Sequence, residues 1–368
     1  MSAMTLFRTV RNGEFATAFC TYYKRCSTVG DEYTPDKKKV IHPYRQIHPW
    51  KSENEFANSL LKNIIYNSDG IVAINKPYGI SLFNKTRDND NTSLTSCHKI
   101  VGDVNYSISD VLPYLVKELD VPALIPCMGA EKYMTGLYVF GINNNVCKEI
   151  DKARRRFQMG KYRKYWAVTI RTPNEIKGKY HLGITLQKSS LGTKKPIILT
   201  KWPNNAVKRN EVKILNINYK IISNSTHNLS SLIEVEASVK KWHSIRLFAS
   251  TKLYSPILGD NYHGSRVQEI MGTWIKVNPF AESCWDMPQI NRQLLHLLDI
   301  KQSQQEIIPT HIHLRSICLT SFGTQKKDIV LEAPLMHPFD WTCKQLMFKH
   351  IPEFNYDNVE DEIKVACL

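Results

Sequence analysis

The chain has 368 residues, of which 42% are hydrophobic and 23% charged, a composition typical of a folded protein with a substantial core. Its 49 lysines and arginines against 34 acidic residues give a formal charge of +15, which favours a polyanionic partner, either nucleic acid or an anionic membrane surface. No run of eighteen apolar residues is present, which excludes a transmembrane helix, and the nine cysteines contain no C-x-x-C pair, which argues against a disulfide scaffold or zinc ribbon and favours a reducing compartment.

The first thirty residues are basic and rich in serine and threonine. Four lysines and arginines stand against a single acid, Glu14, and the apolar residues would share one face if the segment were helical. This composition is typical of a mitochondrial transit peptide, and a plain disordered basic tail is the alternative. We therefore expect residues 1–45 to be a transit peptide with a basic lead-in, and the mitochondrial matrix to be the compartment.

Strand and helix signals alternate after this lead-in. Apolar spacing predicts a helix over 54–65 and a strand over 71–75. A second helix is expected to begin at Ser109 or Asp110, either of which is a favourable N-cap, and a strand follows over 137–140.

The clearest helix covers 144–159, and a strand follows over 165–170. From 151 to 164 the chain carries seven cations and one acid, Asp151. Such a one-sided run favours a surface that follows RNA phosphates, and a solvated helix face is the alternative. The seven cations are Lys152, Arg154, Arg155, Arg156, Lys161, Arg163 and Lys164.

A second set of alternating elements follows, and the end of the chain turns acidic. The expected elements are a strand over 232–239, a short helix over 243–248, a turn over 256–260, and strands over 312–319 and 328–331. Five acids between Glu353 and Glu362, without strong periodicity, predict a loose tail. We expect a catalytic domain over 46–345 and an acidic tail over 346–368.

Five motifs in this order resemble those of the RluA-type pseudouridine synthases. DGIVAINKPYGI (69–80) is similar to the family's opening strand and K-P-x-G turn, and MTGLYVF (134–140) to the end of its H-R-L-D-x-x-T-S-G-L-L-L-F motif. RKYWAV (163–168) is similar to K-x-Y-x-A-x-V, and HLRSICL (313–319) to the L-H-A-x-x-L strand. Between these two, HSIR (243–246) is similar to H-Q-I-R, SPILGD (255–260) to H-P-I-x-G-D, and HG (263–264) to Y-G. Each motif is weak alone, but the ordered series is specific. The H-P-W-K-S-E lead-in and the basic presequence are similar to the mitochondrial RNA pseudouridylate synthase domain-containing subgroup.

This resemblance implies an α+β pseudouridine synthase fold, with a mixed, mostly antiparallel central sheet, flanking helices and an RNA-binding cleft. It implies an isomerase that converts uridine to pseudouridine in mitochondrial rRNA or mRNA, without cofactor or metal, on a nucleotide flipped out of its stack. The expected partners are RNA and proteins of mitochondrial ribosome assembly or RNA granules.

The resemblance also assigns the catalytic roles. Glu131 stands where the family has its catalytic aspartate, Tyr165 would be the aromatic platform for the base, and Arg246 the cation that keeps the carboxylate charged. Met128-Gly129-Ala130 replaces the family's H-R-L. Two alternatives remain open: Glu131 acts as the catalytic carboxylate, or the chain is a non-catalytic RNA-binding factor for mitochondrial ribosome assembly or RNA stability.

RNA contacts are expected from the basic run, together with Lys240, Lys241 and His243. His311 and His313 flank one residue, but no cysteine or acid is near them in sequence, so we expect packed or RNA-facing side chains and no metal. A basic peripheral membrane protein is a third alternative, which no amphipathic surface helix beyond the presequence supports.

Overall fold

The computed structural model describes residues 41–83, 100–102, 104–156, 163–285 and 287–349. The chain divides into two units, 1–41 and 42–368, and all the elements below belong to the second. Residues 1–40 of the predicted transit peptide and lead-in, Lys161 and the acidic residues beyond 349 lie outside the described residues. Tyr44 of the predicted lead-in and Leu346 and Phe348 of the predicted tail are buried in the fold, so the domain extends slightly beyond the expected range 46–345 at both ends. No helix in the described ranges is long and apolar enough to cross a membrane.

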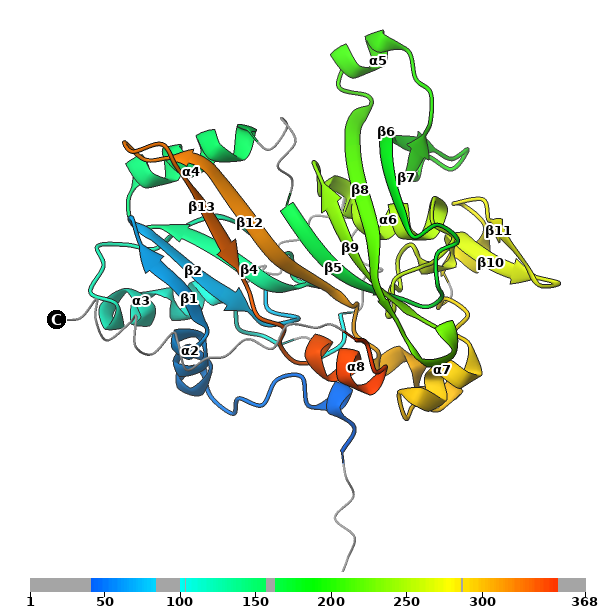
Figure 1. Ribbon diagram of the computed structural model, residues 1–368, viewed down its shortest axis with the longest axis horizontal. Coiled ribbons are helices and arrows are strands. Elements are labelled where there is room, and N and C mark those ends of the chain that lie inside the picture. The colour runs from blue at the N-terminus through cyan, green and yellow to red at the C-terminus, as the bar shows by residue number, and fades with distance from the viewer. Residues whose placement is uncertain (1–40, 84–99, 103, 157–162, 286, 350–368) are drawn as a thin grey trace, which may run out of the picture. The chain divides into compact units, whose positions relative to one another are not determined.

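The second unit is built around strands (Figure 1). They are β1 Ile64–Ser68, β2 Ile71–Lys76, β3 Ile125–Gly129, β4 Thr135–Gly141, β5 Arg163–Thr169, β6 Lys177–Lys188, β7 Lys194–Leu199, β8 Lys213–Asn224, β9 Ser231–Ala237, β10 Val267–Ile270, β11 Thr273–Lys276, β12 Ile312–Phe322 and β13 Lys327–Glu332. The α-helices are α2 Glu53–Lys62, α3 Ile108–Glu118, α4 Asn144–Arg156, α5 Asn204–Lys208, α6 Ser244–Thr251, α7 Arg292–Leu297 and α8 Phe339–Gln345. Short 3₁₀ helices cover Pro43–Arg45, Thr226–Asn228, Lys241–His243, Gly264–Arg266, Glu282–Trp285 and Gln302–Ile307.

One eleven-stranded sheet organises the unit. Its strands lie in the order β1-β2-β4-β12-β5-β9-β8-β6-β7, with β3 paired to β4 and β13 to β12. The pairings among these strands are antiparallel except for a short parallel contact, in which His313 and Leu314 of β12 meet Thr135 and Gly136 of β4. The expected α+β fold with a mixed, mostly antiparallel sheet is confirmed. Strand β12 joins the β1-to-β4 part of the sheet to the β5-to-β9 part.

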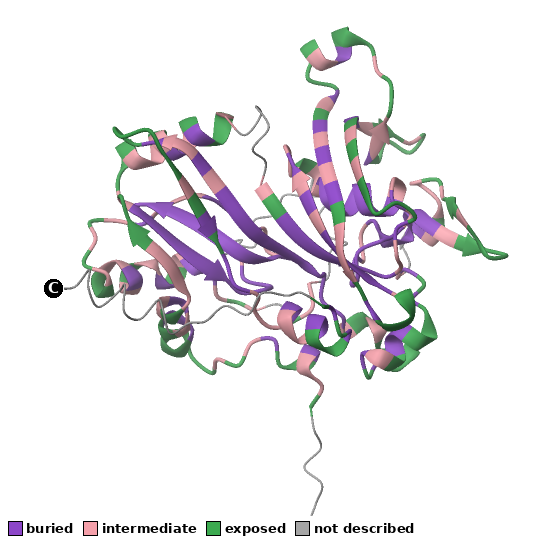
Figure 2. Ribbon diagram, viewed as in Figure 1, coloured by how far each residue is buried: buried purple, intermediate pink, exposed green. Residues whose placement is uncertain are grey.

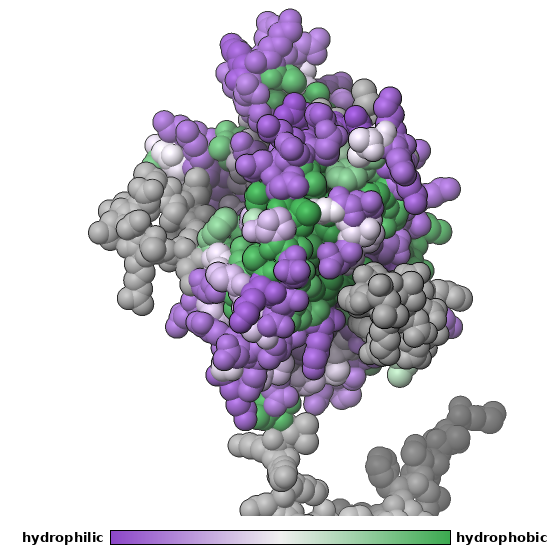
Figure 3. Space-filling view, turned by 90° about the vertical axis from the view of Figure 1, so that its left-hand side faces the viewer, coloured by the Kyte–Doolittle hydropathy of each residue, from purple (hydrophilic) through white to green (hydrophobic). Residues whose placement is uncertain are grey.

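The central strands of the sheet are buried, as their purple colour in Figure 2 shows, so both faces of the sheet are covered there. In β2, Ile71 and Ala73 pack in the main core with Ile150 of α4, whereas Val72 and Ile74 pack toward α2 and α3. This double burial explains why the β2 sequence is a continuous apolar run rather than an alternating one. Figure 3 shows the side of the molecule on which α3 lies, where hydrophobic residues gather at the centre and hydrophilic residues surround them.

The faces of β5 divide the second half of the sheet in the same way. Tyr165 and Ala167 belong to the main core, which α6 covers, while Trp166 and Val168 belong to a second core built with α7 and α8. Successive strand residues point to opposite faces, so neighbouring positions of one motif serve different sides of the molecule.

The predicted elements are present, with corrections at two helix boundaries. The helix expected over 54–65 ends at Lys62, because Ile64 and Ile65 belong to β1, which pairs with β2 and which the sequence analysis does not predict. Ser107, not Ser109 or Asp110, is the N-cap of α3. The Asp110 carboxylate lies in the first turn and accepts hydrogen bonds from the backbone N–H and the hydroxyl of Ser107, at 2.8 and 3.0 Å. The reach of this carboxylate back over one turn forms a capping box and moves the helix start two residues earlier than the cap preference alone suggested.

Gly136 is a position at which a side chain has no room. Its φ is +110°, and a Cβ there would lie 2.4 Å from the carbonyl oxygen of Leu314 on β12. We expect Gly136→Ala to lower the free energy of unfolding by about 2–4 kcal/mol, because strain and overpacking add. Gly192→Ala is the control, since its φ is also positive (+82°) but its nearest neighbour is 4.0 Å away. Urea denaturation measures both, and equal losses would contradict the steric argument.

Candidate active site

Glu131 lies in the tight turn between β3 and β4. The turn is held by the Met134 backbone N–H, which donates to the Glu131 carbonyl at 2.9 Å, and by the Ala130 N–H, which donates to Leu137 at 2.8 Å. The Gly79 N–H donates to the carbonyl of Lys132 at 2.9 Å, so the K-P-Y-G turn braces the turn that carries Glu131. The first two family-like motifs therefore meet at this carboxylate.

The Glu131 carboxylate is surrounded by polar partners. His243 Nδ1 lies 3.3 Å from Oε2, and Lys240 Nζ lies 4.0 Å from Oε1. The Tyr133 hydroxyl also donates to this carboxylate and lies 2.9 Å from His243 Nδ1. Burial alone would raise the pKa of Glu131, but the hydrogen bond from His243 and the charge of Lys240 outweigh it and hold the pKa below its ordinary value. The carboxylate is thus kept ionised.

The backbone ahead of α6 aims His243 at this carboxylate. Trp242 and His243 have φ values of +55° and +54°, so two successive residues adopt the left-handed conformation. This turn joins the end of β9 to the start of α6, and it brings both Lys240 and His243 to Glu131. Histidine is among the residues that adopt this conformation more readily than most.

Arg246 does not meet the expectation drawn for it, because its partner is Asp260. The Arg246 side chain is 2% exposed, its Nε donates to Asp260 Oδ1 at 2.7 Å, and its Nη2 contacts the same oxygen. The turn over 256–260 places this fully buried carboxylate beside α6, closer to the guanidinium than Glu131. Tyr133 links Arg246 to Glu131, since the guanidinium lies 4.7 Å from the centre of that ring and the Tyr133 hydroxyl donates to the carboxylate.

A pocket of about 480 Å³ opens at the Glu131 carboxylate. This volume lies within the range of sites that bind small molecules or single nucleotides. Five cations and one carboxylate line it, which suits a phosphodiester chain. The lining residues are Glu131, Arg154, Arg155, Arg163, Ser238, Val239, Lys240, Lys241, Trp242 and His243.

Tyr165, the expected base platform, lies in the core behind this pocket. It is 2% exposed, and burial, as the largest cause, raises the pKa of its hydroxyl. Arg163 hydrogen-bonds this hydroxyl, and the Glu131 charge acts on it as well. Tyr165 is thus near the carboxylate but does not line the pocket wall.

The predicted RNA-binding residues separate into two groups. Those that the structure brings together at the pocket are Arg154, Arg155, Arg163, Lys240, Lys241 and His243. Three others lie elsewhere. Lys152 pairs with Glu149 at 2.6 Å on the surface of α4, Arg156 donates to the carbonyl of Thr320 at 2.7 Å, and Lys164 points to the opposite face of the sheet.

Two residues near Glu131 were not predicted from the sequence. Tyr133 occupies a variable position of the family motif, so nothing singled it out. Lys76 precedes the proline of the K-P-Y-G turn and is buried, with Nζ donating to the carbonyls of Pro77 and Ile80 at 2.7 and 3.2 Å. Burial, together with the charge of Lys132, lowers the pKa of Lys76 to about 7, against the opposing effect of Glu131.

His311 and His313 are packed inside the fold rather than arranged for a metal. His311 is bonded to Thr342 at 2.6 Å, and His313 to Thr135 at 2.8 Å. Both are almost completely buried, and this burial lowers their pKa values to about 4 and about 3. Among the described residues, no group of three potential ligands is placed to hold a metal ion.

Replacing His243 should move the acidic limb of the pH–rate profile. Asparagine tolerates the left-handed backbone of this position but lacks the imidazole, so His243→Asn removes the largest effect that opposes burial and the pKa of Glu131 rises. The acidic limb of the kcat/KM profile should therefore shift to higher pH. His181→Asn, at an exposed histidine bonded to Asn216, is the control. If the acidic limb did not shift, His243 would not be what lowers the pKa of Glu131.

Comparisons of the sequence and of the fold identify similar known proteins. No family model matches the chain. The mitochondrial pseudouridylate synthase RPUSD4 of Mus musculus is 25% identical over 307 residues, covering 80% of this chain and 71% of that protein. The RPUSD4 protein of Homo sapiens is 24% identical over 328 residues, covering 86% and 76%. The solved structure of human RNA pseudouridylate synthase domain containing 4 superposes with a TM-score of 0.58 at 22% identity, covering 82% of this chain and 98% of that one. The chain is therefore similar in sequence to the RPUSD4 pseudouridylate synthases over about four fifths of its length, and it shares the fold of the solved human structure.

Proposed function

We propose that this protein is an RNA pseudouridine synthase with Glu131 as its catalytic carboxylate. The observation that carries the proposal is an ionised, half-buried carboxylate at the mouth of a pocket lined by five cations. A cofactor-free isomerase of uridine needs this combination, because the RNA backbone must be held while a negative charge stands beside the sugar. The homologues named pseudouridylate synthases support the same reaction.

The reaction breaks the bond between N1 of the base and C1′ of the ribose, and then forms a bond from C5 to C1′. The proton on C5 is lost and N1 gains one, so no net oxidant or co-reactant is needed. Positive charge develops on the sugar as the first bond breaks, and a fixed carboxylate stabilises it. Glu131 is kept charged for this step by His243 and Lys240.

The remaining roles follow from the position of each group. The side chains of Arg154, Arg155 and Arg163 hold phosphates that flank the flipped nucleotide. Tyr165, the base platform that the family resemblance implies, is 2% exposed and does not line the pocket, so it can contact a base only after the pocket wall in front of it has moved. Arg246 acts as a positioning residue, because it holds the Tyr133 ring whose hydroxyl donates to Glu131.

The relatives are named mitochondrial, which supports mitochondrial localisation. We propose that the protein works in the matrix on rRNA or mRNA, alongside proteins of ribosome assembly or RNA granules. The composition of residues 1–30, which is typical of a transit peptide, supports this localisation.

The decisive experiment maps pseudouridine across all mitochondrial RNA in cells that lack this protein, rescued with wild type or Glu131→Ala. A site that vanishes and returns only with wild type supports the proposal and identifies the target. If no site changes and both versions restore mitochondrial translation, the protein is instead an RNA-binding factor with a synthase fold.

A further inference from the structure

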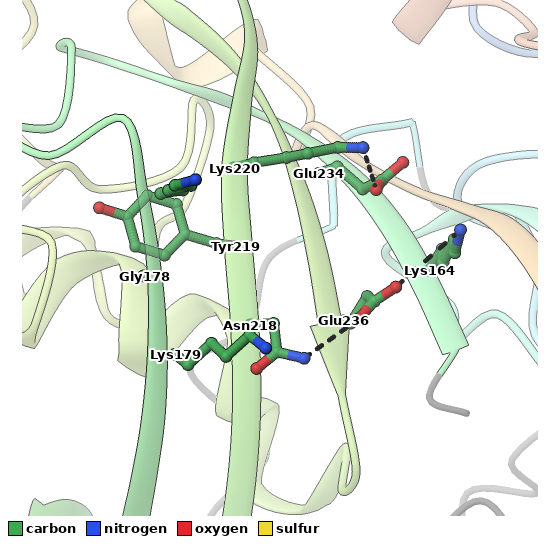
Figure 4. A pocket seen from close by; sticks show the side chains of 9 residues that line it. Lys164, Gly178, Lys179, Asn218, Tyr219, Lys220, Glu234 and Glu236 are labelled. Atoms are coloured by element: carbon green, nitrogen blue, oxygen red, sulfur yellow. Dashed lines mark hydrogen bonds and ion pairs between the residues drawn. The ribbon is translucent and has the colours of Figure 1, made fainter. Parts of the chain in front are cut away.

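A second groove, of about 540 Å³, crosses the sheet on the face opposite to Glu131 (Figure 4). Strand alternation explains the separation, because Tyr165 points into the main core while Lys164 points into this groove. The lysine groove, as we call it, is lined by Lys164, Lys177, Gly178, Lys179, Asn218, Tyr219, Lys220, Glu234 and Glu236.

The groove carries more positive than negative charge. Lys220 pairs with Glu234 at 2.9 Å, and Lys164 approaches Glu236 at 3.9 Å, as the dashed lines of Figure 4 show. The two acids on β9 are thus matched by lysines of the neighbouring strands β8 and β5. Lys177 and Lys179 on β6 are exposed, and no ion pair is found for either among the described residues. The surplus charge of the groove therefore lies on β6.

The C-terminal part of the fold lies on this same face. Phe348 packs in the second core with Trp166, whose indole N–H donates to Glu234 of the groove at 3.3 Å. The backbone N–H of Lys349, the last described residue, donates to Ser223 at 2.8 Å. Ser223 belongs to β8, three positions after Lys220, which corresponds to roughly 10 Å along a strand.

The residues that follow Lys349 have the charge that the groove lacks. Residues 350–368 contain five acids, namely Glu353, Asp357, Glu360, Asp361 and Glu362, and one lysine. An extended chain covers about 3.3 Å per residue, so the four residues from Lys349 to Glu353 span roughly 13 Å. The first acid can thus reach Lys220, and the later acids can reach β6.

We propose that the acidic segment 353–362 docks in the lysine groove. The carboxylates of the segment neutralise Lys177 and Lys179, which removes a basic surface on the side of the sheet away from Glu131. RNA is thereby directed to the pocket in which it can react, rather than to an unproductive face. The proposal does not depend on uridine isomerisation, and its test below contains no measurement of activity.

Lysine reactivity tests the docking in the full-length chain. An acetylating reagent is applied to wild type and to a variant of the same length in which the five acids become Gln or Asn, and modification is read by mass spectrometry. We expect Lys177 and Lys179 to react about threefold or more faster in the variant, since tethering gives the segment a high effective concentration. Lys62 and Lys117, exposed on α2 and α3, are the internal controls and should not change.

Zero-length carbodiimide coupling gives a second readout, because it joins a carboxylate to an amine only where the two touch. Amide links from the segment to Lys177 or Lys179 would support docking, whereas links only to Lys62 and Lys117 would overturn it. Equal reactivity of the groove lysines in both chains would also overturn it. If, in addition, RNA protects these lysines equally in both chains, the groove belongs to RNA.

Discussion

Glu131→Gln is expected to slow pseudouridine formation by about 10²–10⁴-fold, because it removes the charge that acts on the breaking glycosidic bond. RNA affinity should stay within about twofold, since the phosphates are held by separate cations and only one charge in the pocket changes. Single-turnover assays on a uridine-containing RNA measure the rate, and filter binding measures the affinity.

Two further variants make this result specific. Glu131→Asp keeps the charge but withdraws it by roughly 1 Å, and a displacement of this size costs about a hundredfold in rate. Glu149→Gln removes an exposed acid of α4, paired with Lys152 outside the pocket, and should leave the rate unchanged. If Glu131→Gln turned over as fast as Glu149→Gln, the catalytic carboxylate would have to be sought elsewhere.

Asp260→Asn should cause the largest loss of stability, about 3–5 kcal/mol, because it leaves the buried Arg246 guanidinium without its counter-charge. Asp260 is fully buried, and its Oδ1 also accepts the backbone N–H groups of Tyr262 and His263, each at 3.0 Å. Burial would lower the pKa of Arg246, but the Asp260 charge outweighs it and raises the pKa, so the arginine stays charged. Urea denaturation followed by tryptophan fluorescence measures the loss.

The control for this variant is an exposed pair. Lys344 and Asp340 form an i,i+4 pair at 2.8 Å on α8, with the lysine side chain 75% exposed. Asp340→Asn should cost no more than about 0.5 kcal/mol. If Asp260→Asn lost as little stability as Asp340→Asn, Arg246 would not need Asp260 as its counter-charge. Glu131 would then again be the candidate partner of Arg246.

The order of the motifs predicts a candidate site at Glu131, but not how the charges around it pair. Arg246 and Asp260 belong to adjacent motifs of the family, and Glu131 to an earlier one. Which acid the arginine meets depends on how the turn over 256–260 sits against α6, and the spacing of the motifs does not contain this information. Tyr133 was missed for a related reason, because its role arises only from contact with Arg246 and His243.

The basic run over 151–164 shows a second limit of sequence analysis. Its charge predicts one RNA-facing surface, yet the run passes from a helix into a strand. On α4, Arg154 faces the pocket while Lys152 pairs with Glu149. On β5, Arg163 and Lys164 are neighbours that point to opposite faces. The sequence identifies the cations. Which of them share a face depends on where the helix, with 3.6 residues per turn, gives way to the strand, in which neighbouring side chains alternate.

The join made by β12 has a consequence for when the protein can first act. Tyr133 and His243, which meet at Glu131, are 110 residues apart in sequence. Tyr133 lies in the turn between β3 and β4, and His243 in the 3₁₀ helix between β9 and α6. Strand β12, which pairs with both β4 and β5, is made only after both segments. A chain still emerging from the ribosome therefore lacks the strand that locks the two halves of its active site together. We therefore expect RNA modification only from chains whose synthesis has passed β12.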